Sequence, residues 1–225
     1  RLVGSEMCIR DSVMIDEVQL VNEFEDVLNS YLKVPNVDVY ATGSNAKFLS
    51  KDVITTFRGR SFEIKVYPLS FSEYFSVYDG SQEKALDAYM TYGGMPQIVE
   101  FNNDELKSDY LKNLYTETYL RDIKERYQIK NDEEMENLLD FISSSIGSLT
   151  NPSKLANTFT TVKKEKISRN TVCSYLEYIC EAFIAEKASR YDVKGKKYLE
   201  TPYKYYFTDL GLRNARLNFR QLEPS

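Results

Sequence analysis

Histidine is absent from all 225 residues of this sequence. Without an imidazole, the chain has no Ser–His or Cys–His pair that could supply an activated nucleophile. Most zinc sites also use histidine as a ligand. Any chemistry therefore falls to carboxylates, lysines and arginines.

Cysteine is almost as scarce, and its spacing argues against a metal or redox site. The three cysteines are Cys8, Cys173 and Cys180, and none belongs to a Cys-x-x-Cys pair. Cys173 and Cys180 are seven residues apart, which places both on one face of a helix. We therefore expect these two to be small hydrophobic residues of a core.

Long apolar runs are missing as well. No stretch approaches the roughly 20 apolar residues that a membrane-spanning helix needs, and no basic-then-apolar leader with a small-residue cleavage site is present. The composition, 42% hydrophobic and 28% charged, is that of an ordinary soluble protein. We expect a cytoplasmic protein without a membrane partner, built as one large domain or two small ones.

Negative charge prevails overall, but it is unevenly distributed. The formal net charge is −5. Between Lys154 and Arg220, however, 14 basic residues face 7 acidic ones, a local excess of +7. Such asymmetry indicates a polyanion-binding region, although seven acids within it weaken the signal.

Two short apolar segments near the N-terminus have the pattern of buried strands. Residues 13–18 are apolar until they reach Asp16 and Glu17, and residues 37–41 end at Thr42. Between them, residues 17–32 carry apolar side chains at helical spacing. A strand, a helix and a strand within about thirty residues predict a βαβ unit with a parallel sheet.

The rest of the chain is predicted to be mainly helical. After a loop at Arg58-Gly59-Arg60 we expect a strand at 62–66, a helix capped by Ser70, and helices at 83–92 and 104–129 that are separated by the break at Gly93–Pro96. Three further amphipathic helices span 132–147, 151–161 and 168–183, with caps at Asn151 and Ser168, and strands at 184–191 and 204–209 flank a hairpin tip at Gly195. Three helices followed by a hairpin predict a winged helix-turn-helix.

The acids that end the first strand suggest nucleotide chemistry. In an ATPase, Asp16 would hold Mg²⁺, usually through a water, and Glu17 would polarise the water that attacks the γ-phosphate. The alternative is a structural strand whose terminal acids favour the N-terminal dipole of the following helix. The second strand, ending in Thr-Gly-Ser-Asn, strengthens the first interpretation, because Ser44 or Asn45 would contact the same water or phosphate.

Two arginines follow the second predicted strand in the sequence. Arg58 and Arg60 lie about 15 residues beyond the second strand, where a guanidinium can stabilise charge on phosphates within its own subunit or a neighbour's. The alternative is that they are solvated cations of a loop.

An ordered set of motifs makes the resemblance specific. MIDEVQ, ATGSN, FRGRSFEIKVYPLSFSEY, YGGMPQIV, TYLRDI and KYYFTDLGLRNA occur in this order. Together they resemble a family of prokaryotic AAA-type P-loop ATPases in which an ATPase core precedes a winged helix and a C-terminal nuclease-like domain of unknown function. The resemblance covers residues 13 to about 220.

The resemblance implies roles for individual residues. Asp16, which would bind the metal, and the catalytic Glu17 would form the Walker B pair. Ser44 would contact nucleotide, Asn45 would be the catalytic sensor, and Arg60 would be the functional arginine. The implied cofactors are ATP and Mg²⁺, and an Arg60 that acts across subunits would imply a homo-oligomer.

One element of that family does not occur in the sequence. No Gly-x-x-x-x-Gly-Lys-Ser/Thr loop is present, and Gly195-Lys196 has the wrong neighbours. We expect an α/β fragment with a partial parallel-sheet core, which lacks that loop and the C-terminal domain and is therefore inactive. The expected division is a non-native segment at 1–12 resembling a sequencing-adapter junction, an ATPase core at 13–78, a helical connector at 79–131 and a winged helix at 132–220.

The winged helix allows a second interpretation of the protein, as a non-catalytic module. Its recognition helix would span Thr171 to Phe183, and Lys194, Lys196 and Lys197 would form a wing tip suited to DNA phosphates. The helix surface contains Ser168, Arg169, Asn170, Ser174, Glu177 and Glu181. Two acids and one base are a poor match for DNA and favour an interaction with protein.

Overall fold

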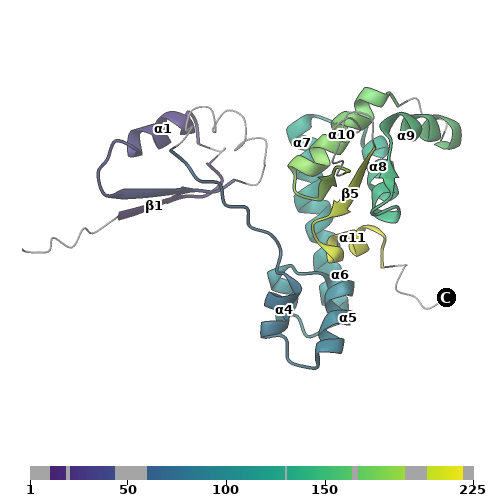
Figure 1. The fold of residues 1–225 in the computed structure, drawn as a ribbon, viewed down its shortest axis with the longest axis horizontal. Helices are drawn as coiled ribbons and strands as arrows, with labels where there is room; N and C mark the ends of the chain where they lie inside the picture. The colour runs from purple at the N-terminus through teal and green to yellow at the C-terminus, as the bar shows by residue number, and fades with distance from the viewer. Residues whose placement is uncertain are drawn as a thin grey trace, which may run out of the picture. The chain divides into compact units, whose positions relative to one another are not determined.

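The computed structural model describes residues 11–18, 21–43, 60–129, 131–163, 167–190 and 202–219. Ser44, Asn45, Arg58, Lys194, Lys196 and Lys197 therefore lie outside the described residues. The chain divides into two compact units, Arg1–Ile64 and Lys65–Ser225 (Figure 1). The finer division predicted from the sequence stays a prediction. No helix among the described residues is long and apolar enough to cross a membrane.

The first unit contains the predicted strand, helix and parallel strand. Its elements are β1 (Asp11–Ile15), α1 (Phe24–Tyr31) and β2 (Val37–Ala41). The two strands pair in parallel from Asp11 opposite Val37 to Ile15 opposite Ala41. Strand β1 therefore begins two residues before the predicted Val13 and ends at Ile15 rather than at residue 18, and α1 begins at Phe24 rather than at residue 17. Asp11 and Ser12, from the segment predicted to be non-native, belong to the strand.

The strand predicted at 62–66 is not formed. Residues 61–67 have no regular secondary structure, and Phe62, Ile64 and Val66 are 88%, 72% and 92% exposed. A strand exists only through hydrogen bonds to a neighbour, and in the described part of this sheet β1 and β2 pair only with each other. Among the described residues no strand pairs with residues 62–66.

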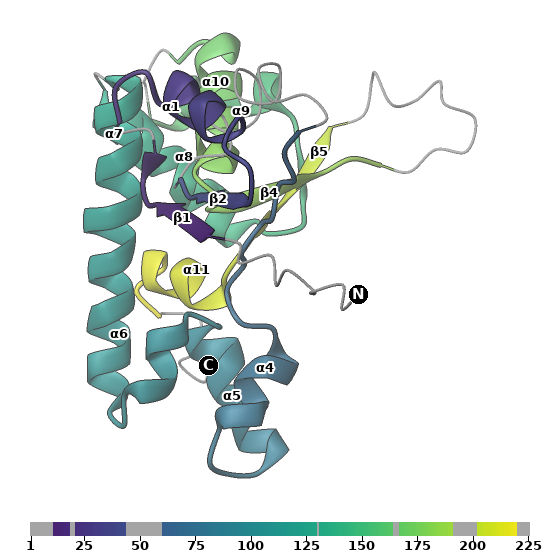
Figure 2. The same ribbon diagram turned by 90° about the vertical axis from the view of Figure 1, so that its left-hand side faces the viewer.

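The second unit begins with helices, of which the first three α-helices have side-chain caps at Ser70, Ser81 and Asn103. Its first elements are α4 (Phe71–Val77), α5 (Gln82–Tyr92), η2 (Pro96–Glu100), α6 (Asp104–Asn113), the π-helical segment η3 (Leu114–Leu120) and α7 (Arg121–Tyr127). Ser70 and Glu73 form a complete capping box at the start of α4. Helices α6 and α7 follow one another as a continuous rod through η3 (Figure 2).

The unit continues with helices and a small antiparallel sheet. These elements are α8 (Asp132–Ser144), β3 (Leu149–Thr150), α9 (Pro152–Thr158), the π-helical η4 (Phe159–Lys163), α10 (Arg169–Glu181), β4 (Ala185–Ala188), β5 (Tyr203–Phe207) and α11 (Leu210–Arg216). The strand order is β3–β5–β4. Asn151 and Ser168 cap α9 and α10 as predicted.

One hydrophobic core joins the helices from η2 to α11 and the strands β4 and β5. It includes Leu111, Ile123, Leu138, Leu176, Ile179 and Leu212, each at most 2% exposed. Cys180 packs against the core, as its helical spacing predicted, and burial raises the pKa of its thiol to about 11. A thiol with that pKa is protonated at neutral pH and behaves as a hydrophobic group.

Hydrogen bonds around Asp209 connect three segments of this unit, which contain Leu69, Gly94 and Asp209 itself. Its carboxylate accepts the N–H of Gly94 at 2.7 Å and the N–H of Leu212 at 2.9 Å. Leu69 N–H donates in turn to the carbonyl of Gly94 at 2.7 Å. A Cβ on Gly94 would lie 2.1 Å from the carbonyl oxygen of Leu69, so only glycine fits there. Gly94 therefore has a structural role, and its hydrogen-bonding partner is an aspartate 115 residues away.

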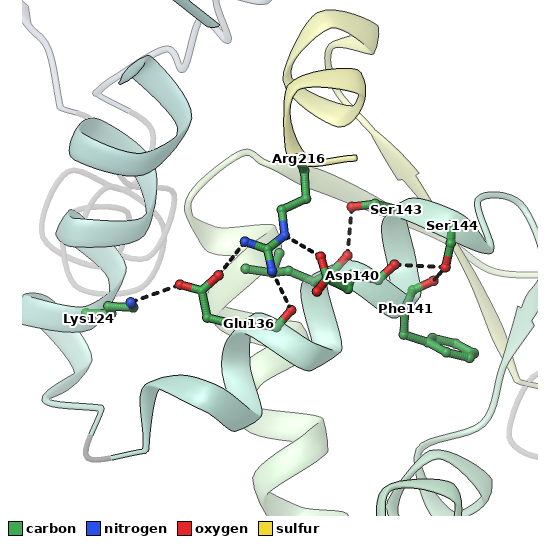
Figure 3. Close-up of polar contacts among 8 residues, drawn as sticks. Lys124, Glu136, Asp140, Phe141, Ser143, Ser144 and Arg216 are labelled. Carbon is green, nitrogen blue, oxygen red and sulfur yellow. Dashed lines mark hydrogen bonds and ion pairs between the residues drawn. The ribbon is translucent and has the colours of Figure 1, made fainter. Parts of the chain in front are cut away.

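Arg216 forms hydrogen bonds and ion pairs that connect α11 to α8 (Figure 3). Its guanidinium donates to Asp140 at 2.6 Å, to a carboxylate oxygen of Glu136, and to the backbone carbonyl of Glu136 at 2.9 Å. Lys124 of α7 donates to the same Glu136 at 3.0 Å. Helices α7, α8 and α11 are thus tied together through one carboxylate.

Candidate active site

The two predicted acids lie at the carboxyl end of the parallel strands. Strand β1 ends at Ile15, so Asp16 and Glu17 follow it directly, and β2 ends opposite at Ala41. The next residue of that chain segment is Thr42, and its hydroxyl donates to Oδ1 of Asp16. The same hydroxyl oxygen accepts the N–H of Glu17 at 3.2 Å.

Backbone hydrogen bonds hold this arrangement beyond the ends of the strands. Thr42 N–H donates to the carbonyl of Ile15 at 2.9 Å, and Val18 N–H donates to the carbonyl of Thr42 at 2.9 Å. Val18 is buried, with 1% of its surface exposed, whereas Asp16 is exposed and Glu17 half-buried. The segment is therefore anchored by one apolar side chain while its carboxylates remain accessible.

Glu17 has an unusual backbone conformation. Its φ is 46°, in the left-handed region that side chains other than those of glycine, asparagine and aspartate rarely adopt. A residue held there costs on the order of 1 kcal/mol and requires support from its surroundings. The hydrogen bonds of Glu17 and Val18 to Thr42 supply that support.

The oxygen atoms of Asp16, Glu17 and Thr42 are suitable ligands for magnesium. Mg²⁺ prefers oxygen ligands such as carboxylates and hydroxyls. Proteins that bind Mg²⁺ with a nucleotide use one or two carboxylates and leave the remaining positions to water and phosphate. In the described residues no cluster of three or more acidic, cysteine or histidine side chains offers a fuller cage.

Arg60 lies in the same unit as the acids. It lines an apolar groove of about 510 Å³ together with α1, β2 and residues 61–64. Phe24, Leu28 and Leu32 supply one wall, and Val37 and Val39 supply another. Asp16 and Glu17 are not among the lining residues, so its role beside the acids stays a prediction, as do those of Ser44, Asn45 and Arg58, which the structure does not describe.

The sequence pattern did not predict a role for Thr42. Ser44 and Asn45, the two residues after the glycine, were the predicted contacts, whereas Thr42, the first residue beyond β2, is the one that contacts the acids. The structure shows why: the two strands start in register at Asp11 and Val37 and have equal lengths, so they end side by side and bring Thr42 next to Asp16. The predicted bounds, 13–18 and 37–41, did not place it there.

Two families match the sequence. The family described as an AAA domain matches residues 5–75, a range that starts inside the segment predicted to be non-native. The family described as Domain of unknown function (DUF8612) matches residues 83–223.

Two curated relatives are each described as an uncharacterized protein. One, from Haemophilus influenzae, is 37% identical over 89% of this chain and 51% of its own length. The other, from Methanocaldococcus jannaschii, is 27% identical over 92% of this chain and 49% of its own length. The chain thus spans about half the length of the curated relatives it matches.

A solved structure is similar in fold. The Walker-type ATPase of Pyrococcus abyssi matches 92% of this chain and 63% of its own, with a TM-score of 0.59 at 15% identity. At this identity the likeness is one of fold. Because the larger family match covers more than half of its residues, the chain belongs to the family described as Domain of unknown function (DUF8612).

Proposed function

We propose that this chain carries the part of an ATPase site that handles magnesium and water. The observation that carries the proposal is the pair of accessible acids at the carboxyl end of two parallel strands. Ligands of open α/β sheets bind outside the carboxyl ends of the strands. The AAA-domain match and the similarity to a Walker-type ATPase support ATP as the nucleotide.

Asp16 and Glu17 have separate tasks in this proposal. Asp16, with one oxygen bonded to Thr42, would hold Mg²⁺ through a water. A bound Mg²⁺ would neutralise charge on the phosphate oxygens. Glu17 would accept a proton from the attacking water as it approaches the γ-phosphate. Ser44 or Asn45 would contact that phosphate or water, and Arg60 would stabilise the developing charge within the subunit or across a homo-oligomer.

The phosphates also need a cradle of backbone N–H groups and a lysine, and no such loop occurs among the 225 residues. We therefore assign it to polypeptide outside them. A P-loop consists of a strand, the loop and a helix. The groove beside β2 is apolar and lies along a strand whose only described pairing is with β1. A parallel strand seated there would deliver its loop to the edge where Asp16 lies.

ATP hydrolysis by the complete gene product tests the proposal. Glu17→Gln keeps the shape of the side chain and removes the base, so kcat should fall by about 100-fold or more while ATP binding is retained. Asp26→Asn, an exposed acid in α1, is the matched control and should leave kcat within about twofold. Equal activity of wild type and Glu17→Gln would overturn the proposal.

The 225-residue chain alone gives a second test. Without the N–H cradle, two carboxylates repel a triphosphate, so calorimetric titration with Mg-ATP should show no micromolar binding. Micromolar affinity in this polypeptide would contradict the assignment of phosphate binding to other segments.

We also propose that residues 132–219 form a winged helix that binds protein rather than DNA. The order α8, β3, α9, α10, β4, β5 and the antiparallel sheet support this architecture. On the surface of α10, Arg169 is the exposed base and Glu177 the exposed acid, which gives no net attraction for phosphates. A mobility-shift titration with duplex DNA should show no salt-dependent binding, and a steep salt slope would favour the DNA-binding alternative.

A further inference from the structure

Thr42 joins the two acids of the candidate site through a single oxygen atom. A hydroxyl has one hydrogen to donate and two lone pairs with which to accept. An ionised carboxylate only accepts, so the hydrogen of Thr42 is directed to Oδ1 of Asp16. One lone pair is occupied by the N–H of Glu17 at 3.2 Å. The hydrogen-bonding capacity of this side chain is therefore used mainly on the two residues assigned to catalysis.

The backbone of Thr42 is committed to the same segment. Its N–H donates to Ile15 and its carbonyl accepts from Val18, both at 2.9 Å. Four hydrogen bonds thus connect one residue of the second strand's end to the four consecutive residues 15–18. The backbone of Thr42 is therefore fixed relative to the acids, and the χ1 rotamer of its side chain then directs the hydroxyl to them.

Two consequences follow for the acids. With Oδ1 of Asp16 occupied by Thr42, the other carboxylate oxygen is left to interact with a magnesium-bound water. The left-handed turn at Glu17, with φ of 46°, is stabilised because its N–H has an acceptor. Both effects orient existing groups rather than add a new one.

We infer that Thr42 is a positioning residue of the ATPase site: its hydroxyl orients the Asp16 carboxylate and holds the turn that presents Glu17. This inference rests on the proposed function. A serine would preserve the hydroxyl but lose the methyl group that restricts χ1. A valine would preserve the branched shape and lose both hydrogen bonds.

The first readout needs no nucleotide. In the 225-residue chain, amide hydrogen exchange of Glu17 should be about 10-fold faster in Thr42→Val than in wild type, because its N–H loses its acceptor, and Thr42→Ser should restore protection to within about threefold. Unchanged exchange at Glu17 in Thr42→Val would overturn the inference.

The second readout is steady-state ATP hydrolysis by the complete gene product. Thr42→Val should lower kcat by about 10- to 100-fold, raise the Mg²⁺ concentration needed for half-maximal activity, and leave KM for ATP within about threefold. Thr42→Ser should recover most of kcat. Thr158→Val, which removes an exposed hydroxyl that bonds within its own helix, is the matched control and should resemble wild type.

The outcomes separate this inference from the function on which it rests. If neither wild type nor Glu17→Gln hydrolyses ATP, the proposed function fails. If Glu17→Gln is inactive while Thr42→Val has wild-type kcat and Mg²⁺ dependence, the function stands and the inference is overturned. If Thr42→Val fails to fold, Thr42→Ser and Thr42→Ala decide: the inference requires activity in the first and its loss in the second.

Discussion

Among the described residues of Arg1–Ile64, Val18 is the one hydrophobic side chain that is buried, whereas Lys65–Ser225 contains a continuous core that draws on every helix from α6 to α11. In the first unit, Met14 and Tyr40 face one another across the paired strands and are 79% and 53% exposed. The two units therefore derive their structure differently: the first from a short hydrogen-bonded ladder, the second from packing.

Two aspartates illustrate what this difference does to similar motifs. Asp16 follows a strand and is exposed, so its carboxylate is available to a ligand. Asp209 also follows a strand but is 4% exposed and accepts backbone N–H groups. Burial raises the pKa of Asp209, and its hydrogen bonds partly oppose that shift. A carboxylate after a strand is thus a candidate for chemistry only where the fold leaves it accessible.

The largest effect on stability is expected at Gly94, in the closely packed second unit. Gly94→Ala would bring Cβ to 2.1 Å from the Leu69 carbonyl oxygen. Because backbone must move, the second unit should lose about 3–5 kcal/mol of its free energy of unfolding. Gly147→Ala is the control: its nearest contact is the Tyr206 ring at 3.2 Å and its φ is +71°, so a loss of about 1 kcal/mol is expected. Urea denaturation measures both, and equal effects would contradict the steric argument.

Asp209→Ala should have the next largest effect. It leaves the N–H groups of Gly94 and Leu212 without an acceptor, and should cost about 2–3 kcal/mol. Ser168→Ala removes a more exposed helix cap and should cost about 1 kcal/mol.

Asp209→Ala should also change how stability depends on pH. The folded-state pKa of Asp209 is raised. The stability that Asp209 contributes is therefore fully present below the ordinary aspartate pKa and is lost as pH rises through the folded-state pKa. The difference in unfolding free energy between wild type and Asp209→Ala should therefore narrow from acid to neutral pH. A difference that widens with pH would contradict the assigned direction.

Arg216 should matter somewhat less. Arg216→Met removes a guanidinium that is 14% exposed and leaves the carboxylates of Glu136 and Asp140 without it. A loss of about 2 kcal/mol is expected. Arg121→Met breaks ion pairs of a side chain that is 66% exposed and should change stability by about 0.5 kcal/mol or less. Thermal denaturation of both variants would refute the difference if their shifts were equal.

The smallest effect is expected in the first unit. Met14→Ser substitutes a side chain that is 79% exposed on the open face of the sheet, so the unit should change by about 0.5 kcal/mol or less. Val18→Ser, at the buried position, should cost about 2 kcal/mol or more. Hydrogen exchange of the β1 and β2 amides distinguishes them, and a large loss in Met14→Ser would mean that this face is covered.

Local features of the fold were predictable from the residues. Ser70, Asn151 and Ser168 cap helices because capping depends on a side chain and the next three backbone groups. The parallel pairing of β1 and β2 also followed, since a helix between two short strands leaves little choice of direction. The strand at 62–66 failed because strand formation depends on a neighbour that the local pattern does not contain.

The sequence by itself determined the helix caps at Ser70, Asn151 and Ser168 and the two acids that follow the first strand, because each depends on residues close together in the chain. Only the tertiary structure decided that Thr42 donates a hydrogen bond to Asp16, that Asp209 accepts one from Gly94, and that Arg216 donates one to Glu136. These partners are 26, 115 and 80 residues apart. Periodicity carries no information over such separations, since packing of the whole unit brings the groups within hydrogen-bonding distance.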